Sequence, residues 1–363
     1  MKKGLQILLG LTLLAALAEG LILIQIRVDP WRAAALLESA ALLVGAFVAL
    51  TQTAFVKQLR HWAMLSPVLA GGLPFLLLVP YLIYGLGTRT FSLSALGKLI
   101  AYILVPTALL MPDRLHHRES LSWRDGAAML ALALPVSAGW LQGIWTWPQE
   151  LYVFRPIFCV LVGGYAFMVV RNLEGVGFRL IWRKGDVWDA VLNLLAFGLL
   201  AIPLGIALNF LHPHSMAPLT RGPIFQIPWL ENVVRGLGPA ANDFFRWLND
   251  ILRGLRPVGN FFFVFIGIYL SIAIPEELLF RGVLQNLLVR TIRKGPHGLY
   301  GLLIASVVFG ASHMHHPPRP NWRYAILATL AGIFYGNVYR TRQRLCANAL
   351  THALVDTIWH FWL

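Results

Sequence analysis

The sequence predicts an all-α protein, a polytopic transmembrane bundle of about eleven helices. Hydrophobic residues make up 58% of its 363 residues and charged residues only 13%. Soluble domains carry about 25% charged residues, so this chain lacks the polar side chains that would cover its surface in water. Its apolar residues occur in runs long enough to cross a bilayer, and its basic residues lie mainly between those runs. These observations place the protein in a lipid bilayer.

Each apolar run is interpreted as one membrane helix, since about 20 apolar residues span the hydrocarbon core. The shorter runs near the C-terminus need other helices around them. The predicted helices are 4–26, 33–55, 62–86, 92–111, 125–145, 152–170, 187–211, 259–289, 298–314, 324–339 and 345–363.

The first run has some features of a secretory signal peptide. Lys2 and Lys3 precede it, and 16–18 reads Ala-Leu-Ala, as a cleavage site would. However, the apolar stretch continues through 21–24, which is too long for the hydrophobic region of a signal peptide. We therefore predict that this helix is retained.

The basic residues indicate how the chain is oriented. A net charge of +14 would suggest a nucleic-acid partner in a soluble protein. Here most basic residues lie in short loops, which indicates membrane topology and anionic headgroups, so no nucleic-acid partner is expected. Most of these loops, including those with Lys57, Arg60 and Arg171, are cytoplasmic if the N-terminus is inside. We predict an integral protein of a bacterial inner (cytoplasmic) membrane, with its N-terminus inside.

A proline-containing segment divides the chain into three parts. Residues 1–211 form an N-terminal transmembrane region of about seven helices, 212–258 a non-cytoplasmic loop, and 259–363 a helical core. Within the loop, Phe244 and Leu248 share a helical face with other apolar residues, which predicts an amphipathic helix in the interface plane. This segment is interpreted as a tethered connector, with substrate gating as the alternative.

Charged side chains at membrane depth each need an explanation, because each costs about 2.5–3.5 kcal/mol or more. In the earlier helices, Glu19, Glu38, Lys98 and Arg155 are isolated, and snorkelling or a local hydrogen bond accounts for them. The last four helices differ because their ionisable residues are grouped. These residues are Glu276, Glu277, Arg281, His313, His352 and Asp356.

Two adjacent carboxylates follow Pro275. Glu277 and Arg281 are four residues apart, so on a helix they share a face and form an ion pair. Glu276 points about 100° away around the helix and has no local cation, which suits it to act as a general base. Pro275 leaves a backbone carbonyl without its donor and can kink the helix. The alternative is a purely structural ion pair, but one cation neutralises only one of two carboxylates.

Histidines complete the group. His313 lies near the end of a short apolar helix, and His315 and His316 follow it. The three could bind a metal, but there is no His-Glu-x-x-His motif and no nearby Cys or Asp cluster, so no metal or cofactor is expected. His352 and Asp356 are four apart on the last helix, where a carboxylate can hold one imidazole nitrogen protonated.

In this order, each in its own membrane helix, the three motifs resemble the CPBP family of intramembrane glutamic peptidases. That family includes the Ras-converting CAAX prenyl endopeptidase and bacterial homologues associated with bacteriocin processing. Its pattern is Glu-Glu-x-x-x-Arg, Phe-x-x-x-His and His-x-x-x-Asn or Asp. The matching residues here are Glu276, Glu277 and Arg281, then Phe309 and His313, then His352 and Asp356. The resemblance covers about 259–363 and does not extend to 1–210.

The resemblance implies roles for these residues. Glu276 and His313 would activate a water that attacks the scissile carbonyl, and Glu277 with Arg281 would position them. His352 would face the developing oxyanion. Where relatives have Asn in the last motif, an amide can donate to the oxyanion. Asp356 could do so only if protonated, so we expect it to orient His352 instead.

The sequence therefore predicts a metal-independent intramembrane endopeptidase of the CAAX type, acting on a membrane-associated protein or peptide. Its expected partners are that substrate, the lipid bilayer and a membrane protein bound through the N-terminal helices. One alternative is a non-proteolytic scaffold or immunity-type binding protein of the same fold. Another is an ion-coupled transporter, since buried Glu, His and Asp also relay protons.

Overall fold

The computed structural model describes residues 29–115, 118–212, 257–292 and 298–363, and every regular element in these ranges is helical. The predicted all-α architecture is therefore confirmed for this part of the chain. The helix predicted at 4–26 and the amphipathic helix predicted within 212–258 lie outside the described residues.

The helices fall into an N-terminal and a C-terminal set. The N-terminal elements are α2 (Pro30–Leu50), α3 (Thr53–Leu65), α4 (Pro67–Gly72), η1 (Leu73–Leu77), α5 (Leu78–Thr88), α6 (Leu93–Leu110), η2 (Met111–Asp113), α7 (Trp123–Ser137), α8 (Phe154–Gly164), η3 (Tyr165–Val170) and α9 (Lys184–Ala207). The C-terminal elements are η4 (Tyr269–Ala273), α13 (Ile274–Glu277), η5 (Leu278–Gln285), α14 (Asn286–Ile292), α15 (Leu299–Ser312), η6 (His313–His315), α16 (Trp322–Arg342) and α17 (Leu345–Trp362).

Among the described residues, five helical segments are long and apolar enough to cross a membrane by themselves. They are Pro30–Leu50, Pro67–Thr88, Leu93–Asp113, Lys184–Ala207 and Pro257–Ile292. Two shorter apolar helices, Phe154–Val170 and Leu299–His315, accompany them. The protein is thus a polytopic helical membrane protein, and the total of eleven spans stays a prediction.

Two predicted helices have different bounds in the structure. The run predicted at 33–55 ends at Leu50, and a separate helix, α3, precedes the next span. Ser66 separates α3 from α4 because its side chain accepts a hydrogen bond from the Val68 amide, which caps a new helix. The run predicted at 125–145 ends at Ser137, and Gly139 and Gly143 beyond it have positive φ angles that a helix cannot contain.

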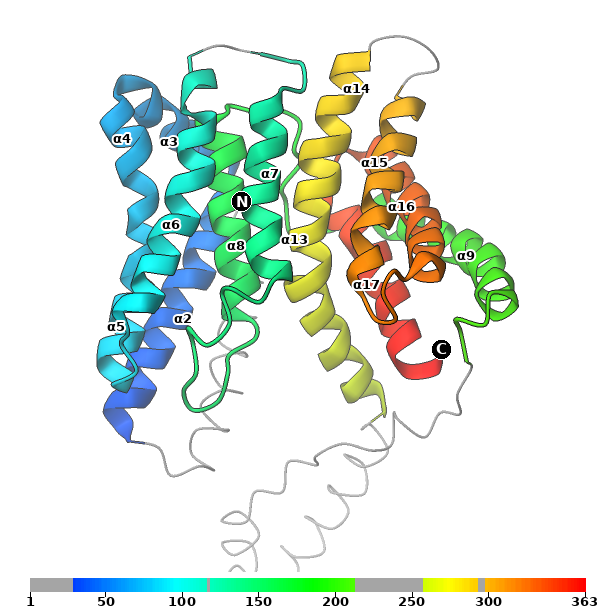
Figure 1. Cartoon of the computed structure of the whole chain (residues 1–363), viewed down its shortest axis with the longest axis horizontal. Helices are drawn as coiled ribbons and strands as arrows, with labels where there is room; N and C mark the ends of the chain where they lie inside the picture. Colours follow the sequence, from blue (N-terminus) through cyan, green and yellow to red (C-terminus); the bar gives the residue numbers. More distant parts are fainter. Residues whose placement is uncertain (1–28, 116–117, 213–256, 293–297) are drawn as a thin grey trace, which may run out of the picture.

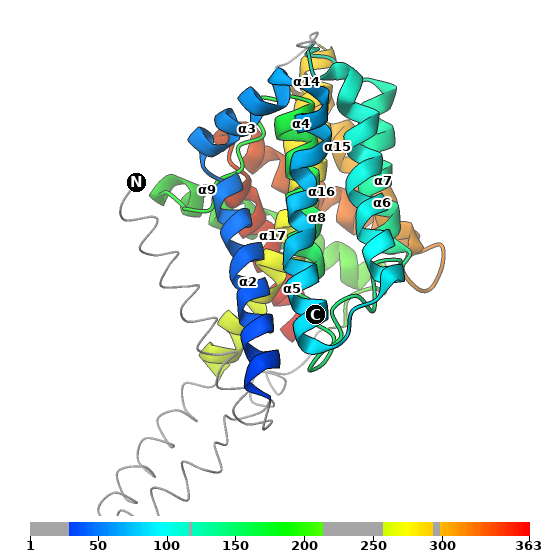
Figure 2. The ribbon, with the colours of Figure 1, turned by 90° about the vertical axis from the view of Figure 1, so that its left-hand side faces the viewer.

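One long helix, Pro257–Ile292, separates two groups of helices. In Figure 1 it runs between α2–α8 on one side and α9 with α15–α17 on the other, and Figure 2 gives the perpendicular view. Although α9 precedes the long helix in sequence, it packs against α16 and α17. Helix α9 of the N-terminal set therefore lies beside helices of the C-terminal set.

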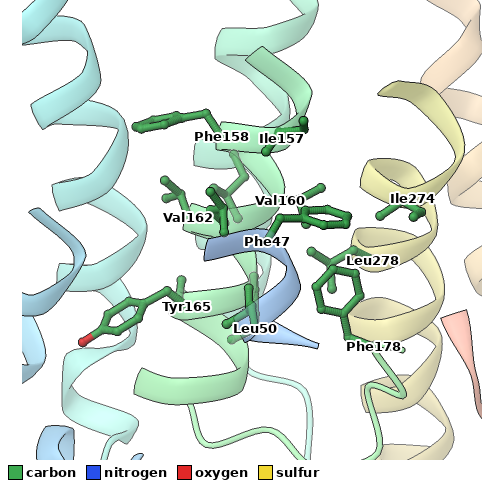
Figure 3. Close-up of a cluster of buried hydrophobic side chains, with 14 of the residues drawn as sticks. Phe47, Leu50, Ile157, Phe158, Val160, Val162, Tyr165, Phe178, Ile274 and Leu278 are labelled. Atoms are coloured by element: carbon green, nitrogen blue, oxygen red, sulfur yellow. The ribbon is translucent and has the colours of Figure 1, made fainter. Parts of the chain in front are cut away.

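The central helix buries one apolar face against the N-terminal set. Figure 3 shows Ile274 and Leu278 beside Phe47, Val160 and Phe178, and all five belong to one buried cluster. Because this face is occupied by packing, the neighbouring residues on other faces of the same helix are directed towards α16 and α17.

Three segments predicted to be cytoplasmic lie at the upper end of the bundle in Figure 1: α3 and the described parts of the loops before α7 and after η3. Arg60 donates to the carbonyls of Met168 and Leu173 at 2.6 and 2.9 Å. Arg171 forms a fully buried pair with Asp125 at 2.7 Å. These contacts tie the segments that carry Arg60 and Arg171 together at this end of the bundle.

Glycine allows α15 and α16 to approach closely. A Cβ on Gly310 would lie 1.8 Å from Thr329 Oγ1 and 2.5 Å from the Ala325 carbonyl oxygen. We expect Gly310→Ala to lower the free energy of unfolding by about 1–3 kcal/mol, the usual cost of overpacking. The measurement is the unfolding midpoint of the purified protein in detergent.

Gly267 provides the matched control, since a Cβ there meets nothing within 4 Å. Gly267→Ala should be neutral or stabilising by up to about 1 kcal/mol, because alanine is the better helix former. Equal midpoints for the two variants would contradict the importance of close packing at Gly310.

Candidate active site

The two adjacent glutamates lie between two widened turns of the central helix. Residues 269–273 and 278–285 are π-helical, and Glu276 and Glu277 occupy the α-helical turn between them. Pro275 has no N–H to complete the regular ladder of hydrogen bonds. Such π-helical insertions in α-helices are frequent at functional sites.

The hairpin geometry brings His313 to the same depth. The chain ascends from Glu277 to the end of α14 at Ile292 and descends along α15 from Leu299 to His313. Both stretches have nearly the same length, and each residue of a helix rises about 1.5 Å. Because α15 packs against both η5 and α14, His313 returns to the level of the glutamates.

Glu277 is the centre of the polar network. It is fully buried, and its Oε1 accepts from Arg281 Nη1 and from His352 Nδ1, each at 2.8 Å. Its Oε2 accepts from the side-chain amide of Asn348. The Glu277–Arg281 ion pair predicted from the spacing is therefore present. The Glu277 carboxylate also joins the central helix to α17 through Asn348 and His352.

Arg281 is buried but well compensated. Its guanidinium lies 4.3 Å from the ring centre of Phe309 and 5.4 Å from that of Tyr335. Nη2 donates to the Gly332 carbonyl at 3.3 Å. A buried cation is tolerated when an opposite charge, hydrogen bonds and aromatic faces replace its water.

His352 is held from three sides. Tyr335 stacks on its ring at 4.6 Å with an interplanar angle of 16°. With Nδ1 donating to Glu277, Nε2 faces the other way, 3.4 Å from Asp356 Oδ2 and 3.9 Å from Glu276 Oε2. We expected Asp356 to orient His352. In the structure, the contact of His352 with Glu277 is shorter than its contact with Asp356.

Glu276 differs from Glu277 because one of its carboxylate oxygens accepts no hydrogen bond from the described residues. Its side chain is 33% exposed, whereas that of Glu277 is 0% exposed. Its Oε2 atom is itself buried and has no hydrogen-bond partner among the described residues. The nearest ring nitrogen is His352 Nε2, at 3.9 Å. Glu276 is thus a carboxylate with an unoccupied acceptor directed into the site.

His313 lies on the other side of the group. It is buried, and its Nδ1 is 2.8 Å from the Phe309 carbonyl oxygen, so this nitrogen donates and Nε2 is left as an acceptor. Its ring contacts Tyr324 at 4.7 Å. His313 and Glu276 form no direct hydrogen bond within the described residues.

The three histidines that could bind a metal make contacts with their neighbours. His315 Nδ1 donates to the Ser312 carbonyl at 2.6 Å, and the His315 and His316 rings pack on each other at 4.1 Å. Among the residues that the structure describes, no group of three or more His, Cys, Asp or Glu side chains is arranged to hold a metal ion.

The structure adds two residues that the sequence reasoning missed. Asn348 is fully buried, one turn before His352, and its polarity at membrane depth was a signal that could have been noticed. Tyr335 had no such signal, because an aromatic residue in an apolar helix usually belongs to the core. Both support residues already in the group, Asn348 through Glu277 and Tyr335 through His352.

The fold and the site together define a class: a polytopic helical membrane protein with a buried carboxylate, arginine and histidine network between its last helices. Residues 258–358 match the family model described as Rce1-like, type II CAAX prenyl endopeptidase Rce1-like. This match supports the CPBP/CAAX protease family that the three motifs predicted. The match covers less than a third of the chain. No curated protein and no solved structure matches it.

Proposed function

We propose that this protein is an intramembrane glutamic endopeptidase that hydrolyses a peptide bond in a membrane-associated protein or peptide. The observation that carries the proposal is the contrast between two adjacent carboxylates. Glu277 is saturated by Arg281, Asn348 and His352, whereas Glu276 Oε2 has no hydrogen-bond partner among the described residues. A carboxylate with a free acceptor beside an imidazole is suited to take a proton from water.

In the proposed reaction, Glu276 is the general base and His313 its partner. His313 Nε2 is available to accept a hydrogen bond, since Nδ1 is committed to the Phe309 carbonyl. A water held between these two side chains would attack the scissile carbonyl while Glu276 removes its proton.

The negative charge that develops on the carbonyl oxygen needs a preorganised donor. His352 has that role in the proposal, with Nε2 on the same side as Glu276. Glu277 positions the imidazole through Nδ1, while Arg281 and Asn348 fix Glu277. Donors held rigidly in a site without bulk water stabilise an oxyanion more strongly than flexible ones.

We also propose an orientation in the membrane and roles for the segments before the catalytic core. The end of the bundle that gathers the basic loops faces the cytoplasm of a bacterial cell, which puts the N-terminus inside. Within 1–211, the described helices α2 and α8 contribute to the core that packs on the central helix. We propose that this region also binds a membrane partner and that 212–258 connects it to the catalytic core 259–363. Through α9, the N-terminal region also contributes a wall beside α16 and α17.

The test compares cells that express the wild-type protein with cells that express Glu276→Gln. Mass spectrometry of membrane fractions should find new protein termini in the wild-type cells alone, at a consistent site near a membrane segment. Identical sets of termini would overturn the proposal. Proton or ion flux in vesicles containing the purified protein, together with identical termini, would favour the transporter.

A chelator experiment tests the metal-independent mechanism. We expect wild-type cleavage of the substrate identified in this way to be unchanged by EDTA, because the proposed base is a carboxylate and not a metal-bound water. Inhibition that is reversed by added zinc would contradict a glutamic mechanism and favour a metallopeptidase. Zinc analysis of the purified protein provides a control that does not depend on activity.

A further inference from the structure

We propose that Asp356 is the catalytic acid that protonates the leaving amine, and that Asp356 and Glu276 share one proton across His352. This inference rests on the proposed peptidase function and assigns Asp356 a role beyond the orientation of His352.

The carboxylates of Asp356 and Glu276 lie on one side of the His352 ring, and the carboxylate of Glu277 lies on the other. Asp356 Oδ2 and Glu276 Oε2 both lie within 4 Å of His352 Nε2, at 3.4 and 3.9 Å. Glu277 contacts the opposite nitrogen, Nδ1. The side chains of Asp356 and Glu276 are 23% and 33% exposed, whereas Glu277 is inaccessible. A substrate can therefore reach these two carboxylates and not the third.

Charge balance then assigns the proton. Three carboxylates face one permanent cation, Arg281, and one imidazole that becomes a cation when Nε2 is also protonated. Among the described residues, His313, Tyr324 and Tyr335 are further ionisable groups around them. Uncompensated charge at membrane depth is costly. In the proposal, His352 is protonated on both nitrogens, so that two cations balance two carboxylates and the third carries the shared proton.

The proposed reaction decides which carboxylate that is. Glu276 must be ionised to act as the base, and Glu277 is ionised in its pair with Arg281. In the reactive state of this proposal, the shared proton is therefore on Asp356. His352 Nε2 lies within reach of both exposed carboxylates, so a proton can pass between them once the products have left.

The protons balance in this scheme without another reactant. The water oxygen forms a bond to the carbonyl carbon as Glu276 takes one water proton, giving a tetrahedral intermediate. The carbon–nitrogen bond breaks as Asp356 gives its proton to the leaving nitrogen, which produces a carboxylic acid and an amine. Glu276 then holds a proton and Asp356 a negative charge, and transfer through His352 restores the starting state.

Infrared spectroscopy of the purified protein in detergent tests the shared proton without any substrate. At neutral pH, the wild-type protein should show the C=O stretch of a protonated carboxyl group, and Asp356→Asn should lack it. Glu276→Gln should lack it too, since removing one negative charge lets Asp356 ionise. Asp189→Asn is the control and should keep the band, because Asp189 lies in α9 and is paired with Arg342 of α16. An unchanged band in Asp356→Asn would overturn the inference.

Kinetics separate an acid from an oxyanion donor. Asparagine keeps the size of Asp356 and its N–H can donate to an oxyanion, but it has no proton to transfer. We expect Asp356→Asn to lower kcat by about 10²-fold or more on a quenched fluorescent peptide bearing a farnesylated C-terminal Cys-aliphatic-aliphatic-X sequence, or on the substrate found in cells. A para-nitrophenyl ester of the same acyl segment should be spared, because its leaving group departs without protonation.

The experiments distinguish a failure of the proposed role of Asp356 from a failure of the proposed peptidase function. Equal losses on the peptide and the ester, or no loss on either, would overturn the role of Asp356 and leave the peptidase function intact. Cleavage of the peptide by Glu276→Gln would instead overturn the proposed function. Unfolding midpoints measured for every variant identify any loss that is caused by misfolding.

Discussion

Glu276→Gln is expected to reduce proteolysis by about 10³-fold, within the range that a general base contributes. Glutamine has the size of glutamate but cannot accept a proton from water. The fold should tolerate the change, because Glu276 Oε2 makes no hydrogen bond within the described residues and the side chain is partly exposed. The measurement is the initial rate of peptide release, together with the unfolding midpoint of each variant.

The same substitution elsewhere in a membrane helix supplies the control. Glu38 is an exposed acid on α2, in the N-terminal set and far along the chain from the site. Glu38→Gln should cleave at the wild-type rate. A folded Glu276→Gln protein with wild-type activity would remove Glu276 from the role of base.

Arg281→Met is expected to cause the largest loss of stability. Removing one partner of a buried ion pair costs about 3–5 kcal/mol, because the other charge is left buried and uncompensated. Here the remaining charge is Glu277, which is 0% exposed, and the contacts of the guanidinium with Phe309 and Tyr335 are lost as well. Denaturant or thermal unfolding in detergent measures the change.

A double variant distinguishes stability from function. Adding Glu277→Gln to Arg281→Met removes the uncompensated charge, so part of the lost stability should return. Activity should not return, because the carboxylate that holds His352 Nδ1 is gone. Arg342→Met is the control, since its pair with Asp189 is partly exposed and surface pairs contribute little. Equal stability of Arg281→Met and wild type would show that the pair is not a support of the site.

The predictions from sequence succeeded where the physical signal is local. A stretch of apolar residues must be helical in lipid, because each backbone N–H needs a partner within its own segment. Glu277 and Arg281 are neighbours on any helix, so their pair followed from spacing alone. The boundaries were less secure, as α3 and the end of α7 show, since polar caps and glycine conformations interrupt apolar runs without changing their hydropathy.

The sequence by itself determined that this protein lies in a lipid bilayer, that its membrane segments are helical and which residues are charged within those segments. Only the tertiary structure decided which nitrogen of His352 meets which carboxylate, and that Asn348 and Tyr335 complete the network. Those contacts join α13, η5, α16 and α17, and their geometry depends on how helices distant in sequence are rotated against one another. Local spacing does not contain that rotation, which follows from side-chain packing across the whole bundle.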